Sequence, residues 1–153
     1  MTGNINKNHT NLEQFRLLLK KHSLKATAQR LAVHEAMMSL GHASADMVTE
    51  AIKTKGETRV TVASVYNILT QLALLGIYDY RMSSNNKMYF DINTFPHIHL
   101  YDRENHQYRD LIDDELMGIV EDHLKRKRFR GFRIEHVDIQ LVGVPTRRKY
   151  RTA

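Results

Sequence analysis

Cysteine is absent from the 153-residue sequence, and this absence excludes several kinds of site at once. Without thiolates the chain has no disulfide, no zinc ribbon and no thiol-based redox switch. Any bound metal must therefore be held by nitrogen and oxygen donors. The sequence contains nine histidines that are available for that role.

Long apolar runs are also missing. No stretch approaches the roughly 20 apolar residues that a membrane-spanning helix needs, and the first ten residues, MTGNINKNHT, have no apolar core of a secretion signal. We therefore expect a soluble, cytoplasmic protein with no membrane partner. Lys and Arg outnumber Asp and Glu by 23 to 17, giving a net charge of +6. This charge favours a polyanionic partner, although it also serves solubility.

Helical periodicity predicts four helices in the first half of the chain. The first begins in the capping-box pattern Thr10-Asn11-Leu12-Glu13, and Thr27, Ser44 and Thr61 are expected to cap the other three. Each of the last three ends at a glycine, which accepts the left-handed conformation of a helix end. The expected helices span about 11–22, 27–40, 44–55 and 61–75.

A hairpin is expected after the fourth helix, from strand-like runs at 77–82 and 87–92. Three helices, a fourth with a polar edge and a hairpin are typical of a winged helix-turn-helix, whose recognition helix enters the DNA major groove. The polar edge carries Ser64, Tyr66 and Asn67 rather than a solvated Glu/Lys mixture. We prefer DNA binding to the alternative of a helical domain with an idle hairpin.

The second half of the chain predicts a small β-β-α-β layer. Alternating strands are expected near 97–101 and 106–112, a helix over 114–127 and a last strand over 134–142. A layer of this size buries its sheet poorly alone, so we expect a homodimer. The predicted fold class is α+β. The expected parts are a winged-helix domain (1–92), a hinge (93–96), a dimerisation and metal-sensing domain (97–144) and a basic tail (145–153).

Five potential metal donors converge on this frame. Alternate residues of a strand share a face, so His97 and His99 present two imidazoles together. A hairpin would place Asp110 opposite His99, while Asp91 closes the wing and His42 precedes the third helix. Taken singly, each could be an ordinary edge-strand histidine, turn carboxylate or surface residue. Their convergence favours a metal site.

Three segments, LKATAQRLAVHEAMMSLGHASADMVTEAI, VASVYNILTQLALLGI and YFDINTFPHIH, resemble the ferric uptake regulator superfamily. The resemblance covers roughly residues 10–143. It implies a bacterial metal-dependent transcription regulator that binds a palindromic double-stranded DNA operator as a dimer. It also implies that Lys25 enters a minor groove, and Arg59 is a plausible phosphate partner.

The resemblance implies a regulatory metal site with five ligands. The matching positions of this chain are His42, Asp91, His97, His99 and Asp110. Aspartate at both acidic positions is similar to the peroxide-responsive branch and to the iron response regulator branch. Three imidazoles and two carboxylates suit Fe(II) or Mn(II), and Zn(II) in vitro.

Two further sites of the family are absent from this sequence. Its structural zinc uses a Cys-x-x-Cys that falls on Asp102 and Asn105, so we expect no structural zinc bound by four cysteines. Its additional site falls on Pro96 and Ile98, whose side chains bind no metal. His136 lies one residue out of register with the last ligand of that site, and we expect it to be structural or exposed.

Several signals are compatible with these residues. The peroxide-responsive branch implies oxidation of His42 or His97 when Fe(II) is bound, whereas the iron response branch implies haem sensing through His97 and His99. A mononuclear metalloenzyme is a third reading. It is disfavoured because no serine or cysteine nucleophile or general base is placed beside the cluster. We therefore expect a regulator rather than an enzyme.

Overall fold

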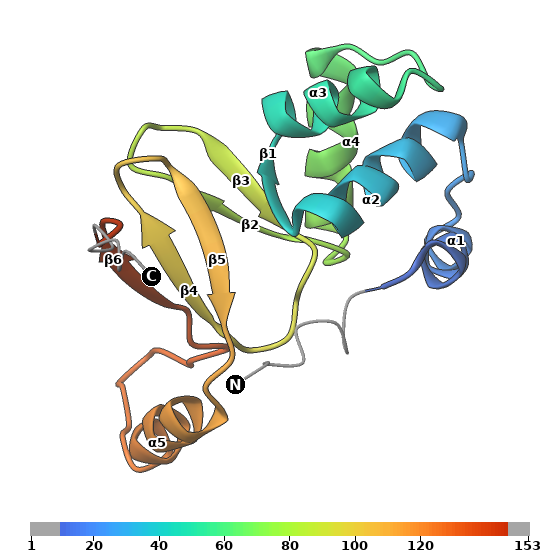
Figure 1. Ribbon diagram of the computed structural model, residues 1–153. Coiled ribbons are helices and arrows are strands. Elements are labelled where there is room, and N and C mark those ends of the chain that lie inside the picture. The colour runs from blue at the N-terminus through green and yellow to red at the C-terminus, as the bar shows by residue number, and fades with distance from the viewer. Residues whose placement is uncertain (1–9, 147–153) are drawn as a thin grey trace. The chain divides into compact units, whose positions relative to one another are not determined.

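The computed structural model describes residues 10–146 and has an α+β fold (Figure 1). The chain divides into two compact units, Met1–Phe95 and Pro96–Ala153, each with its own three-stranded sheet. The division falls within residues 93–96, whose role as a hinge stays a prediction. Most of the predicted basic tail lies outside the described residues. Among residues 10–146, no helix has the length and apolar character needed to cross a bilayer.

The first unit contains four helices, as the sequence predicts. They are α1 (Leu12–Lys21), α2 (Ala28–Leu40), α3 (Ala45–Lys55) and α4 (Val62–Leu74). Thr27, Ser44 and Thr61 cap the last three, each accepting a hydrogen bond from the backbone three residues on. Gly41 and Gly56 follow α2 and α3 with φ of +73° and +75°. A larger side chain at either position would be strained.

The capping box of α1 lies one residue later than predicted. Asn11, not Thr10, is the cap: its side chain accepts from the Gln14 N–H at 2.8 Å, and the Gln14 side chain accepts from the Asn11 N–H at 3.0 Å. Asparagine is at least as good a cap as threonine, and glutamine completes the box as well as glutamate. The expected pattern and the observed one therefore differ by a single register step.

His34 anchors α1 to the core of the first unit. Its ring is fully buried and stacks on Phe15 of α1 with centroids 4.0 Å apart. Nδ1 lies 2.6 Å from the Tyr78 hydroxyl, and Nε2 lies 2.6 Å from the carbonyl oxygen of Thr10. Burial raises the pKa of the Tyr78 hydroxyl, so this group stays protonated beside the imidazole. Both ring nitrogens of His34 therefore have hydrogen-bond partners within the core.

The recognition-helix candidate α4 is amphipathic. Val65, Leu69 and Leu72 are fully buried in the core. Val62, expected on the same side, is 43% exposed and borders a surface hollow together with Tyr66. Val62 lies in the first turn of α4 and outside the core, so the polar edge of the helix has one apolar residue beside it.

The wing contains one strand that the sequence did not predict. The expected hairpin forms from β2 (Asp79–Met82) and β3 (Met88–Asp91). A short strand, β1 (His42–Ser44), pairs antiparallel with the other edge of β3, giving the order β1-β3-β2. Three residues are too few to show a two-residue periodicity, so only the tertiary pairing identifies β1.

The second unit is the predicted β-β-α-β layer. It contains β4 (Ile98–Asp102), β5 (Gln107–Leu111), α5 (Asp114–Lys125) and β6 (Ile139–Gly143). The sheet order is β5-β4-β6, with β4 antiparallel to β5 and parallel to β6. The last strand starts five residues later than expected. Ile134 is exposed and Gly131 has a φ of +69°, so this stretch of chain is a connection rather than a strand.

The turn between β4 and β5 is held by a carboxylate. Asp102 Oδ1 accepts from the backbone N–H groups of Glu104 and Asn105 at 2.9 and 3.1 Å, and Asn105 Nδ2 donates to Oδ2 at 2.8 Å. Asp102 and Asn105 are the two positions at which the family resemblance places zinc-binding cysteines. Hydrogen bonds from a side chain to a nearby backbone are a standard way to fix a turn.

Replacing Asp102 by asparagine should destabilise this hairpin in a pH-dependent way. The hydrogen bond from the Asn105 side chain, followed by those from the backbone, lowers the pKa of Asp102 from its ordinary value of 3.8. A lowered folded-state pKa stabilises the fold above the unfolded value and loses that effect as pH falls through the folded one. Asp102→Asn should therefore have a lower melting temperature at about pH 7, and its deficit should shrink toward about pH 3.

The matched control is Asp122→Asn on α5, where the carboxylate is 70% exposed and 3.8 Å from Lys125. Its melting temperature should follow that of the unmodified chain at every pH. A deficit for Asp102→Asn that is equal at neutral and acidic pH would contradict the charge-assisted account.

Candidate metal centre

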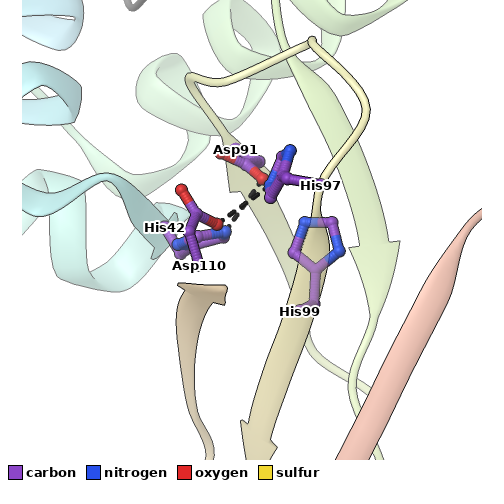
Figure 2. Close-up of side chains that lie close together, drawn as sticks. All are labelled: His42, Asp91, His97, His99 and Asp110. Carbon is purple, nitrogen blue, oxygen red and sulfur yellow. Dashed lines mark ion pairs between the residues drawn. The ribbon is translucent and has the colours of Figure 1, made fainter. Parts of the chain in front are cut away.

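The first unit contributes a buried histidine–aspartate pair. The register of β1 and β3 places His42 opposite Asp91, and His42 Nε2 lies 2.8 Å from Asp91 Oδ2 (Figure 2). The other carboxylate oxygen, Oδ1, accepts from the Asn93 N–H at 2.9 Å. Both side chains are nearly inaccessible, at 6% and 2% exposure. One carboxylate oxygen is thus fixed by the backbone while the other faces the imidazole.

The second unit contributes two histidines and an aspartate. His97 immediately precedes β4 and His99 lies within it, with Ile98 fully buried between them. The two imidazole centroids are 4.2 Å apart. Asp110 on β5 lies opposite His99, but its Oδ1 is 2.9 Å from His97 Nε2, a diagonal contact (Figure 2). One donor atom from each of these residues lies within 4.8 Å of the other two.

The sequence analysis named these five residues as metal ligands, which stays a prediction, and it did not name Asp138. This residue immediately precedes β6, and its Oδ1 lies 3.5 Å from His99 Nδ1. The contact depends on the parallel pairing of β4 and β6, which brings together residues about 40 positions apart in the chain. No local pattern in the sequence signals such a pairing.

The chemistry of the donors fits a first-row divalent cation. Burying a carboxylate or an imidazole away from water costs free energy unless the group is paired or binds a metal. Imidazole and carboxylate together are the ligands that Fe(II), Mn(II) and Zn(II) accept. His42 and Asp91 could hold such an ion from the first unit, and His97, His99 and Asp110 from the second.

The predicted DNA-contacting residues lie in the first unit with different exposures. Tyr66 is 42% exposed, and its ring meets Phe90 of the wing edge-on at 6.4 Å. Asn67, Lys25 and Arg59 are exposed. The Ser64 hydroxyl is engaged in the cap of α4, where it accepts from the Thr61 N–H and donates to the Thr61 carbonyl.

Comparison with known proteins identifies the family. The family model described as "Ferric uptake regulator family" matches residues 21–142, which is most of the chain. The chain belongs to the ferric uptake regulator family. Members of this family are metal-responsive transcription regulators, not enzymes. The metalloenzyme reading is thereby set aside.

Three relatives illustrate the similarity. A ferric uptake regulation protein homologue from Archaeoglobus fulgidus is 29% identical over 110 residues, which are 71% of this chain and 83% of that one. The Campylobacter jejuni peroxide stress regulator has 28% identity and a TM-score of 0.63, covering 91% of this chain and 99% of its own. The Helicobacter pylori ferric uptake regulator has 20% identity and a TM-score of 0.72 over 96% and 99%, and is described as having three functional metal-binding sites.

Proposed function

We propose that this protein is a metal-dependent DNA-binding regulator whose five donors, His42, Asp91, His97, His99 and Asp110, bind one divalent cation. The observation that carries the proposal is the division of buried donors between the two units. The first unit provides a two-residue group and the second a three-residue group. An ion held by both groups would fix the angle between the units.

Neither donor group is a complete metal site by itself. Protein sites for divalent cations generally use four to six ligands, whereas the groups offer two and three side chains. The connection between Asp91 and His97 contains only residues 92–96. A chain of that length keeps the two groups within about 20 Å. An ion bound to one group would therefore meet the other group at a high effective concentration, because the connection between them is short.

The ion is proposed to be Fe(II) or Mn(II), with Zn(II) binding in vitro. Zn(II) binds imidazole and carboxylate donors more tightly than Mn(II) or Fe(II), so the physiological ion would be set by its availability in the cytoplasm. A haem-responsive role receives no support from the relatives described above. A metal ion is therefore the proposed ligand.

A homodimer is proposed to form through the second unit. Its small sheet leaves apolar side chains in solvent, with Ile119 at 59%, Phe132 at 71% and Val142 at 58% exposure. Apolar patches of this kind are typical of association surfaces. A dimer reads two half-sites of a palindromic operator only when its recognition helices match the spacing of the groove. Fixing the angle between the units would set that spacing.

DNA is proposed to contact the polar edge of α4. Tyr66 and Asn67 are the candidates for base or phosphate contacts, because both are exposed there. Lys25 and Arg59 are exposed cations that would bind phosphates or enter a minor groove. Ser64 is assigned a supporting role in the same surface, since its hydroxyl caps the helix.

Peroxide is proposed as the signal that inactivates the Fe(II) form. Two features support this: both acidic ligands are aspartates, and the Campylobacter jejuni peroxide stress regulator is 28% identical over most of the chain. Hydrogen peroxide would transfer one oxygen atom to an imidazole carbon of His42 or His97 and leave as water. Fe(II), if bound by these residues, would supply the redox chemistry for this transfer.

Metal and DNA should strengthen each other's binding. The test uses a palindrome selected from random duplex DNA in the presence of Mn(II), and measures Mn(II) affinity with and without it. Linkage requires that both affinities rise by the same factor, about 5- to 150-fold. His97→Ala should abolish the effect, whereas His123→Ala on the exposed surface of α5 should preserve it. Identical Mn(II) isotherms with and without DNA would exclude the coupling.

Substitution of Tyr66 separates recognition from packing. Tyr66→Ala should abolish sequence-specific DNA binding while leaving metal content and dimer mass unchanged, because the Tyr66 ring meets Phe90 of the wing. Tyr66→Phe keeps the ring against Phe90 and removes the hydroxyl. It should weaken specific binding by about 10-fold, in line with the loss of one polar contact to DNA. Loss of the dimer in Tyr66→Ala would instead make Tyr66 a packing residue.

Peroxide treatment of the Fe(II) form should add oxygen to a ligand histidine. Peptide mass spectrometry should find a gain of about 16 Da on the peptide that contains His42 or His97, with fragment ions excluding methionine, which gains the same mass as a sulfoxide. The Mn(II) form treated in the same way is the control and should remain unmodified. A gain confined to methionine, or equal gains with both metals, would contradict peroxide sensing at this site.

A further inference from the structure

Asp138 lies just before β6 and next to His99, one of the two neighbouring histidines of the second unit. The parallel register of β4 and β6 pairs Ile98 with Ile139 and His99 with Gln140, so Asp138 lies just before the start of this ladder. Residues two apart on a strand share a face, which puts Asp138 on the same side as Gln140 and His99. His99 is thereby flanked by one aspartate from each neighbouring strand, Asp110 on β5 and Asp138 before β6.

The two aspartates meet the histidines differently. The side chain of Asp110 is only 10% exposed and lies 2.9 Å from His97. The side chain of Asp138 is 50% exposed, and its Oδ1 lies 3.5 Å from Nδ1 of His99. Asp110 is therefore placed as a donor inside the cluster, while the half-exposed Asp138 approaches the buried Nδ1 of His99.

The identity of the nitrogen that faces Asp138 matters. A neutral imidazole carries its proton on one nitrogen and a lone pair on the other. A neighbouring group that accepts a hydrogen bond from one nitrogen keeps the proton on that nitrogen. A carboxylate at Nδ1 favours the tautomer with Nδ1–H and leaves Nε2 as the donor. The ring plane is further restrained by Tyr108, which meets His99 edge-on with centroids 6.5 Å apart.

We propose that Asp138 is a positioning residue that accepts the Nδ1–H of His99, so that Nε2 of His99 is the nitrogen presented to the metal ion. This rests on the proposed function of His99 as a ligand. Metal-bound histidines commonly donate their second ring N–H to a carboxylate, which fixes the ring and raises its basicity. Nothing in the family resemblance assigns a role to Asp138.

The test compares Asp138→Ala, which removes the acceptor, with Asp138→Asn, which keeps a neutral acceptor, in the full-length protein. Mn(II) affinity should fall about 10- to 100-fold in Asp138→Ala, at unchanged stoichiometry, and Asp138→Asn should lie between it and the unmodified chain. Asp122→Ala, which removes an exposed carboxylate from α5, should leave Mn(II) affinity unchanged.

A second readout does not require metal. Nitrogen-15 NMR of the histidine side chains in the metal-free protein should show His99 as the Nδ1–H tautomer, and Asp138→Ala should shift it toward the Nε2–H form. A merely structural role would leave the tautomer unchanged. Unaltered tautomer and unaltered Mn(II) affinity in Asp138→Ala would overturn the proposal.

Two other outcomes are also decisive. If Asp138→Ala loses as much Mn(II) affinity as Asp110→Ala and the tautomer of His99 is unchanged, Asp138 is itself a ligand and the positioning role is wrong. If the unmodified chain binds no Mn(II), the proposed function fails. The tautomer measurement then still decides whether Asp138 accepts from His99.

Discussion

Pairing of β1 with β3 is the constraint on which the chemistry of the first unit depends. The strand β1 has only three residues, yet its register sets His42 against Asp91. A slip of one residue would turn His42 to the opposite face of the sheet. Ser44 ends the same strand and caps α3, so the helix position and the histidine position are fixed together. The donor pair is therefore a consequence of how the wing joins the helices.

Burial gives this pair its energetic weight. A buried carboxylate beside an imidazole is tolerable because Asn93 donates to one oxygen and His42 lies against the other. Removing one partner of a buried ion pair typically costs about 3–5 kcal/mol, since the remaining group is left without compensation. The same arrangement explains why a cation would be accepted: it would bind two groups that are already close together and already removed from water.

Local chemistry made much of this fold predictable. Thr27, Ser44 and Thr61 are good caps in sequence and act as caps in the structure, because capping depends on a few neighbouring residues. What could not be predicted is non-local: β1, the late start of β6 and the contact of Asp138 with His99 all depend on pairing between distant strands. The five proposed donors were found because their spacing matches a family pattern. Asp138 belongs to no such pattern, and its contact with His99 is identified only by the register of β6.

The absence of cysteine limits the ways in which the second unit can be stabilised. Where the family resemblance places thiolates, Asp102 and Asn105 form a hydrogen-bonded turn that constrains only the few residues between β4 and β5. A structural zinc would tie distant segments together and contribute directly to folding. This turn cannot do so, and the proposed dimer would therefore depend more on the exposed apolar residues of the unit.

If the metal ion also binds His99 on the central strand β4, it would stabilise the sheet from which that apolar surface extends. Metal occupancy would then influence the proposed dimer as well as the proposed closing of the angle between the units. A ligand shifts an equilibrium only by its difference in affinity for the two states. A cation that binds both donor groups in one conformation and only one group in the other would have a higher affinity for the first conformation.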